Sequence, residues 1–586
     1  MHFKDQAQHF LDKEKQFHLG ILPTEKSHPL TSDLSDRIIR DTSDGVRTLM
    51  EVDRDIVPIA REAFLSHEYD LLVKSISACI ESGNTVCFSS CGASGRLAII
   101  LESMWRSFWS EYCAKHHEGP KHFKHFEDQV YSIMTGGDRA LIRSVENFED
   151  YQEFGRRQFR DSGLGKGDLL IALTEGGEIS SVIGTMKEAL ENGSGVFMVY
   201  NNPTEVLIDR FDRSREMLTH PGLIKLNLTT GPMALAGSTR LQATTIAMLV
   251  VGAALEESFE RILPASQDSS SGEKDGPGSS KTGSLYTEIF EDLISQLNEQ
   301  EVTEKIAELI DIEADCYLKS GRVTYVADRY LLDIFSDTTE RSPTFMIPPF
   351  RQFDDTDSPV PWAYAMDPLR NSYDAWIHLL KREPRGLDWT KEDYLAMGAP
   401  PEIQERVHSL DNEQILKFHI GKEGDPSRYL APRSVLMRII ANEPGNPEAD
   451  RWWEENSALF THSVIVFIGQ KPSGSAGGEQ IHIPLEIPES RTRLFTHLAI
   501  KMIFNILSTG TMAKIGRIRG NWMIQLDATN KKLTDRAIRI IAHFAEIPYE
   551  NACHELFRTI SEPAADRKQF KESYIIQTLK RLGVEI

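Results

Sequence analysis

Residues 86–100 read VCFSSCGASGRLAII, an extended β-branched and aromatic run that breaks at Gly-Ala-Ser-Gly-Arg and resumes with helical spacing. A strand, a glycine-containing turn and a helix in this order form the repeating unit of a parallel α/β sheet. Four more extended runs follow, separated by helical stretches such as residues 180–192: YSIMTG, DLLIALTEG, GVFMVYN and LIKLNLTTG. The sequence therefore predicts an α/β domain with a doubly wound, five-stranded parallel sheet at residues 60–263.

The second half of the chain repeats this signal more sparsely, in RVTYVA, SVIVFIGQ and IHIPLEI. A Thr-Arg-Leu triplet followed by a helical run occurs in both halves, from Ser238 and from Arg491, each time after the last extended run. These similarities predict a duplication. We expect a second α/β domain at residues 284–526 that is a degraded or elaborated copy of the first.

Three further segments complete the predicted organisation. Residues 1–59 are expected to form a mostly helical N-terminal arm. Residues 264–283, PASQDSSSGEKDGPGSSKTG, are rich in Ser and Gly and nearly free of apolar residues, which is typical of a flexible linker. Residues 527–586 have helical periodicity without strand runs, so we predict a helical cap, or lid.

The composition excludes several classes of function. The chain has 586 residues and a net charge of -22 at pH 7, which opposes a nucleic-acid surface because phosphate backbones require clustered Lys and Arg. No run of about 18 apolar residues occurs, and the opening segment is too charged for a secretory signal and too acidic for a transit peptide. We therefore expect a cytoplasmic protein of several domains that binds neither nucleic acid nor a membrane.

The Cys and His residues give no sign of a metal site. The six cysteines form no C-x-x-C pair, and the histidine-rich segment at residues 113–125 has no recognised zinc spacing. The turn at Gly92 matches neither a dinucleotide-binding nor a Walker sequence. We therefore predict no metal and no cofactor.

The turn after the first predicted strand has the features of an anion cradle. Gly92 and Gly95 allow close approach of the backbone, Ser90 and Ser94 offer hydroxyl groups, and the following helix presents unpaired N–H groups and its positive end. The alternative is a Gly-Ser turn that simply joins a strand to a helix. Two further glycine-containing turns, at residues 174–184 and 229–240, bring more hydroxyl groups to the same edge of the sheet. All three turns should converge on one crevice, which favours a phosphate or anion site.

Several motifs resemble one family. LPTEKSHPLT, GASGRLAII, TGGDRALIRSVENFED, GPMALAGSTR and NILSTGTMAKIGRIRGNWMIQLDATNKKLTDRA are similar to the sugar isomerase (SIS) family, in the branch of the N-acetylmuramic acid 6-phosphate etherases and the glucokinase regulatory protein. The resemblance implies an α/β fold of two SIS domains, each a flavodoxin-like, three-layer unit with a parallel sheet, plus a C-terminal helical cap. It also implies a phosphosugar ligand.

The etherase resemblance implies two functional glutamates. The second of them matches Glu149 in VENFED, but the position of the first is Met104 in the first half of the chain. In the second half, SDTTERSPTF resembles the missing segment and puts Glu340 at that position. Because one half keeps the cradle and Glu149 while the other keeps Glu340, we infer one composite pocket between the two domains.

The residues assigned to ligand binding come from the three turns and from the resemblance. Arg517 matches a lysine that contacts the sugar phosphate in the regulatory protein, whereas Glu175 and Glu178 would repel a phosphate unless they are turned away, protonated or hydrogen-bonded. Glu178 has a second interpretation as an N-terminal charge for the helix that begins at Ile179. The full predicted set is Ser90, Gly92, Ala93, Ser94, Gly95, Arg96, Thr174, Gly176, Glu178, Ser238, Thr239, Arg240, Glu340 and Arg517.

Two classes of function follow from the resemblance. The first is a sensor that binds a sugar phosphate between two SIS domains and regulates a sugar kinase; for this class the resemblance also allows a nuclear location. The alternative is a carbon–oxygen lyase that cleaves a lactyl ether on an amino-sugar phosphate, with Glu340 and Glu149 as the two carboxylates that share the roles of acid and base. A second alternative is a phosphosugar isomerase that uses the same carboxylates. The sequence leaves open which phosphosugar binds, whether a kinase partner exists and how many copies of the chain assemble.

Overall fold

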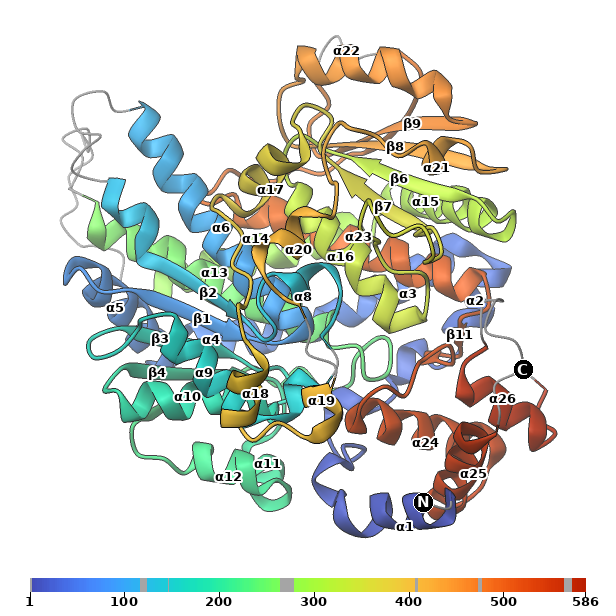
Figure 1. Ribbon diagram of the computed structural model, residues 1–586. Coiled ribbons are helices and arrows are strands. Elements are labelled where there is room, and N and C mark those ends of the chain that lie inside the picture. The colour runs from blue at the N-terminus through green and yellow to red at the C-terminus, as the bar shows by residue number, and fades with distance from the viewer. Residues whose placement is uncertain are drawn as a thin grey trace.

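The computed structural model of the protein describes residues 3–115, 124–145, 147–263, 279–405, 409–472, 477–562 and 572–585 (Figure 1). Its first sheet has the order β2-β1-β3-β4-β5, and all neighbouring strands are parallel. This is the flavodoxin-like order, and each strand coincides with one of the five predicted runs. The strands are β1 (Val86–Ser90), β2 (Val130–Met134), β3 (Leu169–Leu173), β4 (Gly195–Tyr200) and β5 (Leu223–Asn227).

The second sheet repeats the first. Its order, β7-β6-β8-β9-β10, is the same when its strands are counted along the chain, and all its pairs are parallel. The predicted second α/β unit is therefore confirmed, and its sheet is complete. The strands are β6 (Arg322–Val326), β7 (Ala363–Met366), β8 (Ser434–Ala441), β9 (His462–Ile468) and β10 (Glu479–Ile483).

Four long helices lie between the two sheets and join them into one hydrophobic core (Figure 1). Each sheet contributes the helix after its first strand and the helix after its last, and both faces of the central strands are buried, which explains their continuous apolar runs. The helices are α6 (Gly92–Lys115), α13 (Gln242–Ile262), α16 (Leu331–Phe345) and α23 (Leu494–Lys514).

The remaining helices cover the outer faces. On the first unit, α9 (Gln152–Asp161) packs closely on α10 (Ser180–Glu191), and α5 (His67–Glu81) packs on α13. The other helices that flank the two sheets are α8 (Arg139–Ile142), α11 (Thr204–Arg210), α12 (Asp212–Leu218), α14 (Ser279–Leu297), α15 (Gln300–Leu318), α17 (Ser372–Leu380), α18 (Lys391–Ala396), α19 (Pro401–Glu405), α20 (Asn412–Leu416), α21 (Pro426–Tyr429) and α22 (Pro447–Asn456).

The connection between β7 and β8 crosses from the second unit to the first. Trp389 and Tyr394 of this connection pack with Phe148 and Phe154 of the first unit, and the Trp389 indole donates a hydrogen bond to Asp161 at 2.7 Å. The second unit is thus elaborated in its connections and not shortened in its sheet.

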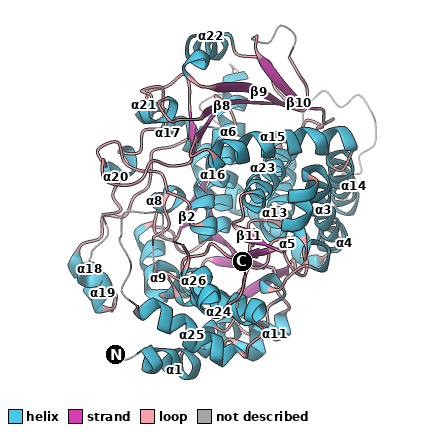
Figure 2. Ribbon diagram, turned by 90° about the vertical axis from the view of Figure 1, so that its right-hand side faces the viewer, coloured by secondary structure: helices cyan, strands magenta, loops and turns pink. Residues whose placement is uncertain are grey.

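The N-terminal arm and the C-terminal helices contact each other. The arm consists of α1 (Phe3–Lys13), α2 (Leu34–Arg40), α3 (Thr42–Glu51) and α4 (Ile56–Phe64). A short hairpin, β11 (Ile518–Arg519) with β12 (Trp522–Met523), leads from α23 to the cap, which we define as α24 (Lys531–Ala545), α25 (Tyr549–Ser561) and α26 (Tyr574–Arg581). Helix α1 packs on α25, while α2 and α3 pack on α23, so the arm reaches from the cap to the second unit (Figure 2).

Two predicted segments fall partly or wholly outside the described residues. Residues 264–278 of the predicted linker and residues 116–123 of the histidine-rich segment are not described, and α14 begins at Ser279, so the last five positions of the predicted linker are helical. Within the described part of the chain, no helix combines the length and apolar character that a membrane span needs.

Candidate functional site

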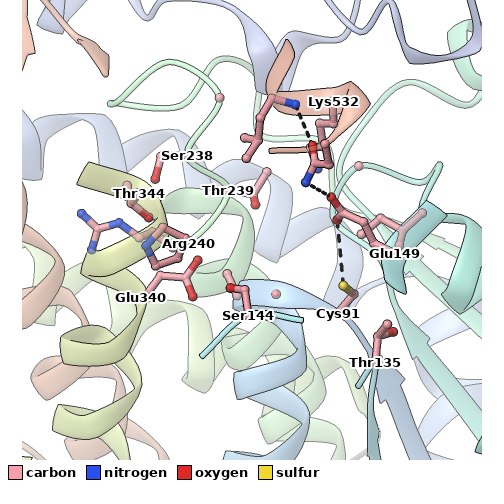
Figure 3. Close-up of a pocket in the computed structure, with 18 of the residues that line it drawn as sticks. Cys91, Thr135, Ser144, Glu149, Ser238, Thr239, Arg240, Glu340, Thr344 and Lys532 are labelled. Atoms are coloured by element: carbon pink, nitrogen blue, oxygen red, sulfur yellow. Dashed lines mark hydrogen bonds between the residues drawn. The ribbon is translucent and has the colours of Figure 1, made fainter. Parts of the chain in front are cut away.

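A cavity of about 190 Å³ lies where the two α/β units and the cap meet (Figure 3). We call it the first cavity. Its walls come from the turns after β1, β3 and β5 in the first unit, from the last part of α16 in the second unit, and from the start of the cap. The polar and charged side chains that line it are Cys91, Arg96, Thr135, Ser144, Asn147, Glu149, Glu175, Ser238, Thr239, Arg240, Glu340, Thr344, Thr529, Asn530, Lys532 and Arg536.

The cradle turn at residues 91–96 presents its backbone to the cavity. Gly92 has a φ of 60°, which favours glycine, and it begins α6; Gly92 and Ala93 both line the cavity. The hydroxyl of Ser90 donates to the Leu173 carbonyl, and that of Ser94 donates to the Cys91 carbonyl at 3.1 Å. The two serines therefore hold the turn together, and the positive end of a 24-residue helix faces the open space.

Glu340 enters the first cavity from α16 and pairs with a cation of the first unit. Its Oε2 lies 2.6 Å from Arg96 Nη1, and both side chains are largely buried. The Arg96 guanidinium also donates to the carbonyls of Gly92 and Leu141, each at 3.2 Å. This ion pair crosses the junction of the two units and holds the glutamate beside the cradle turn.

Glu149 lies on the opposite side of the cavity from Glu340 (Figure 3). Burial raises the pKa of Glu149, and the nearby Lys532 ammonium opposes this effect only in part. Asn530 of the cap donates to Glu149 Oε1 at 2.7 Å, and the Cys91 thiol lies 3.9 Å from Oε2. The composite arrangement puts the two predicted glutamates in one cavity, with different electrostatic surroundings.

The two acidic residues of the second turn are accommodated in different ways. Glu178 is not among the residues that line the first cavity: its Oε2 pairs with Arg213 at 2.7 Å and its Oε1 lies 3.7 Å from Lys532 Nζ. Glu175 does line the cavity, accepts a hydrogen bond from the Thr244 hydroxyl at 2.5 Å, and has a pKa raised by burial. Both arrangements reduce the repulsion that these residues would exert on a bound anion.

The third turn brings Ser238, Thr239 and Arg240 to the cavity wall. Arg240 is buried, and it donates from Nη1 to Asp337 at 2.8 Å and from Nη2 to Thr509 at 2.8 Å. Since Asp337 and Thr509 belong to α16 and α23, this arginine is a second bridge between the two units at the wall of the cavity.

Several predicted residues do not line the first cavity. Arg517 donates to the Phe345 carbonyl at 2.8 Å, at the end of α16, and its guanidinium lies over the Trp362 ring at 4.7 Å. Thr174 is buried at the end of β3, and Gly95 faces Met134. The structure thus brings together Gly92, Ala93, Arg96, Glu149, Gly176, Ser238, Thr239, Arg240 and Glu340, and it leaves Ser90, Ser94, Gly95, Thr174, Glu178 and Arg517 outside the lining.

The cap supplies lining residues that the sequence analysis did not assign. Asn530, Lys532 and Arg536 all face the cavity from the start of α24. All three lie in DATNKKLTDRA, the end of the longest family motif, and the resemblance gives no role to these individual residues. The sequence motif therefore marks these residues, but it does not indicate that the start of α24 lies against the cavity.

An ion pair network joins this part of the cap to the N-terminal arm. Buried Glu25 pairs with Arg536 at 2.6 Å and with Arg539 at 2.5 Å. Burial raises the pKa of Glu25, but the two guanidinium groups outweigh burial and hold the pKa at about 2, against an ordinary value of 4.5. Glu25 thus ties the arm to the helix that covers the cavity.

This network predicts a loss of stability in acid. A carboxylate with a lowered pKa stabilises the folded state above its unfolded-state value of 4.5, and this stabilisation disappears as the pH falls from there toward 2. Its size at pH 7 is about 3 kcal/mol. We expect Glu25→Gln to lower stability at pH 7 and to flatten the dependence of the urea unfolding midpoint on pH below 4.5. The exposed Glu62→Gln is the control, and equal acid slopes in the two variants would contradict the assignment.

Comparison with known proteins agrees with this geometry. The family model described as "Glucokinase regulatory protein N-terminal SIS domain" matches residues 71–190, which include the cradle turn and Glu149. Residues 71–190 of the chain are therefore similar to an SIS domain. The matched region holds β1, β2, β3 and the helices that follow them.

The curated relatives that the chain resembles are bacterial N-acetylmuramic acid 6-phosphate etherases. The chain is 28% identical over 204 residues to the N-acetylmuramic acid 6-phosphate etherase of Aliivibrio fischeri strain MJ11. This alignment covers 35% of the chain and 59% of that etherase. The chain is 30% identical over 232 residues to the etherase of Gloeobacter violaceus, and this alignment covers 39% of the chain and 65% of that etherase. Among solved structures, tagatose-6-phosphate ketose/aldose isomerase from Escherichia coli has a TM-score of 0.41 and 10% identity, over 80% of this chain and 91% of the isomerase.

Proposed function

We propose that this protein binds a sugar phosphate in the first cavity and acts as a sensor, with the bound ligand setting its affinity for a partner protein. The observation that carries the proposal is the composite wall of the cavity, which combines the cradle turn, Glu340 of the second unit and Lys532 of the cap. A ligand there touches three parts of the molecule at once. Its binding energy therefore depends on how these parts are placed relative to one another.

The contacts around the cavity support a route by which binding is transmitted between the parts of the molecule. Arg96 and Arg240 already connect the two units through Glu340 and Asp337, and Glu25 connects the arm to the cap. A sugar phosphate that competes for these cations, or completes their coordination, shifts the relative stability of alternative placements of the units. The resemblance to the glucokinase regulatory protein points to a sugar kinase as the partner.

Ligand-dependent thermal unfolding of the full chain tests the proposal. Fructose 6-phosphate, fructose 1-phosphate, glucosamine 6-phosphate and N-acetylmuramic acid 6-phosphate are compared, and released lactate is assayed with the last of them. A ligand at 100 times its dissociation constant stabilises the folded state by about 2.7 kcal/mol. Stabilisation by a fructose phosphate, together with ligand-dependent capture of a sugar kinase, is the expected result. No stabilisation by any sugar phosphate would overturn the proposal.

An etherase-like lyase is the second candidate, and the two glutamates favour it. Burial raises the pKa of Glu149, whereas Glu340 Oε2 lies 2.6 Å from the Arg96 guanidinium. Cleavage of an ether β to a sugar aldehyde needs a base that removes the α-hydrogen and an acid that protonates the departing oxygen. Two carboxylates in such different surroundings can divide that work, with Glu340 beside a guanidinium as the base and buried Glu149 as the acid.

Glu340→Gln separates the two candidates. If the protein is a lyase, this variant should lower lactate release at least 100-fold, since general base catalysis contributes about 10² to 10⁴ in rate. Its stabilisation by sugar phosphate should remain, because the amide keeps the size and polarity of the carboxylate beside Arg96. Exposed Glu81→Gln is the matched control. Lactate release that is unchanged in Glu340→Gln would exclude the catalytic role, and absence of lactate release in the unmodified protein would leave the sensor.

A further inference from the structure

A second cavity, of about 180 Å³, lies at the other end of the contact between α6 and α16. It is formed by the start of α16, with Tyr330, Leu331 and Asp333, and by the later part of α6, with Met104 and Glu111. In the first cavity the roles are exchanged, because the start of α6 meets the later part of α16. The two cavities are therefore related by the duplication of the chain.

The correspondence holds residue by residue. Strand β6 begins at Arg322, 236 positions after the start of β1 at Val86, and Glu340 follows Met104 by the same 236 positions. Glu340 lines the first cavity and Met104 lines the second. The repeated Thr-Arg-Leu triplet likewise contributes residues to both cavities.

Thr239 and Arg240 line the first cavity, and their counterparts Thr492 and Arg493 line the second. The second cavity thus retains the position and the framework of a ligand site. Met104 puts a thioether where the first cavity has the Glu340 carboxylate.

Cations dominate the charged lining of the second cavity. Its lining includes four basic side chains but only two carboxylates, and ion pairs neutralise only some of the basic groups. Arg493 pairs with Glu111 at 2.6 Å, and Arg329 pairs with Glu443 at 3.1 Å. Asp333 accepts from His497 at 2.9 Å. The four basic side chains are Arg329, Lys381, Arg491 and Arg493.

Lys381 and Arg491 have no carboxylate within 4 Å among the residues that the structure describes. The nearest polar partner of the half-buried Lys381 ammonium is His378 Nδ1, at 3.4 Å. His378 is neutral at physiological pH, since burial lowers its pKa to about 3, and burial likewise lowers the pKa of Lys381 to about 8. A cation kept from water without a counter-charge favours the binding of an anion from solution.

We propose that the second cavity is a separate binding site for a small phosphate-bearing anion. Lys381 and Arg491 supply the charge that the phosphate needs, and the beginning of the 15-residue α16 adds its positive end. Because Met104 replaces the carboxylate found at Glu340, this site binds its ligand without acid–base chemistry. The anion is either free phosphate or a sugar phosphate, and both share the same recognition chemistry.

Equilibrium dialysis of the full chain against radiolabelled inorganic phosphate tests this proposal. We expect two bound equivalents per chain. Ala93→Asp places a carboxylate in the cradle turn and should remove only the equivalent in the first cavity. Lys381→Met and Arg491→Met should each weaken the remaining equivalent at least tenfold in the Ala93→Asp background, whereas Lys381→Arg and the exposed Lys391→Met should leave it unchanged.

The outcomes separate this site from the proposed function. If Ala93→Asp binds no phosphate, or if Lys381→Met binds the same amount as its background, the second site does not exist, whatever the first cavity does. Thermal unfolding without ligand verifies that each variant is folded. Competition by fructose 6-phosphate in the Ala93→Asp background then identifies the ligand: displacement shows that the site takes sugar phosphates, and persistence of the label shows that it takes free phosphate.

Discussion

Gly184→Ala is expected to lower the free energy of unfolding by about 3 kcal/mol or more, because the added Cβ would lie 1.9 Å from the carbonyl oxygen of Gln152. That oxygen belongs to the backbone of α9, so no change of rotamer relieves the clash. A Cβ at Gly155 would similarly lie 1.7 Å from the Ser181 carbonyl oxygen. The two helices therefore approach each other through both glycines, and separating them disturbs the close packing of the first unit.

Urea denaturation of Gly184→Ala and Gly165→Ala checks this prediction. Gly165 has no atom within 4 Å of an added Cβ, so its alanine variant should stay within about 0.5 kcal/mol of the unmodified protein. Helix α10 directly follows the turn that carries Glu175, so Gly184→Ala should also weaken stabilisation by sugar phosphate. Equal unfolding midpoints for the two variants would show that α9 and α10 have room to move apart.

Arg341→Leu is expected to cost about 3 to 5 kcal/mol, because it leaves buried carboxylates without a counter-charge. Arg341 pairs with Glu313 at 2.6 Å and with Asp337 at 2.7 Å, and all three side chains are buried. Glu313 also accepts from the hydroxyls of Tyr317 and Tyr325. The network continues through Asp337 to Arg240 at the wall of the first cavity.

Thermal unfolding measures this effect, with Lys305→Met as the matched control. Lys305 lies on α15, the helix of Glu313, and its pair with Glu308 is exposed, so its loss should change stability by less than about 1 kcal/mol. Arg341→Leu should also reduce the stabilisation by sugar phosphate, since Asp337, the carboxylate that pairs with Arg240, is no longer held by Arg341. If Arg341→Leu is as stable as Lys305→Met, the buried network contributes nothing beyond a surface pair.

The first sheet was predictable from the sequence because its strands are buried on both faces and end at glycine-containing turns. Two strands of the second unit were not predicted. In β8, Arg438 interrupts the apolar run, and only the fold shows that this buried arginine pairs with Asp450 at 2.6 Å. In β7, four residues that follow a long Pro- and Asp-containing connection give too short a signal. Both segments form strands because they pair with β6 in the sheet, and their local sequence pattern does not indicate this.

The candidate site was predictable only in part, because motifs identify residues but not the contacts that they make with residues distant in sequence. Motif resemblance led to Glu149 and Glu340. Because Met104 stands where the first half lacks a glutamate, the sequence also predicted the composite cavity that contains both. It did not show that Glu178 turns toward Arg213, or that Arg517 reaches the end of α16, because side-chain direction depends on neighbours distant in sequence. The contribution of Lys532 was missed, since nothing local indicates that α24 returns to the first unit.

The pairing of Glu25 with Arg536 joins positions 511 residues apart, so Glu25 is synthesised long before its partner exists. A ribosome adds about 5 to 20 residues per second, so roughly half a minute to two minutes pass between the two residues. Between the synthesis of Asn227 and that of Glu340, the first unit has all its strands but lacks both Glu340 and Lys532. A nascent chain therefore meets cellular metabolites without a complete cavity, and ligand can steady only the finished molecule, not its folding on the ribosome.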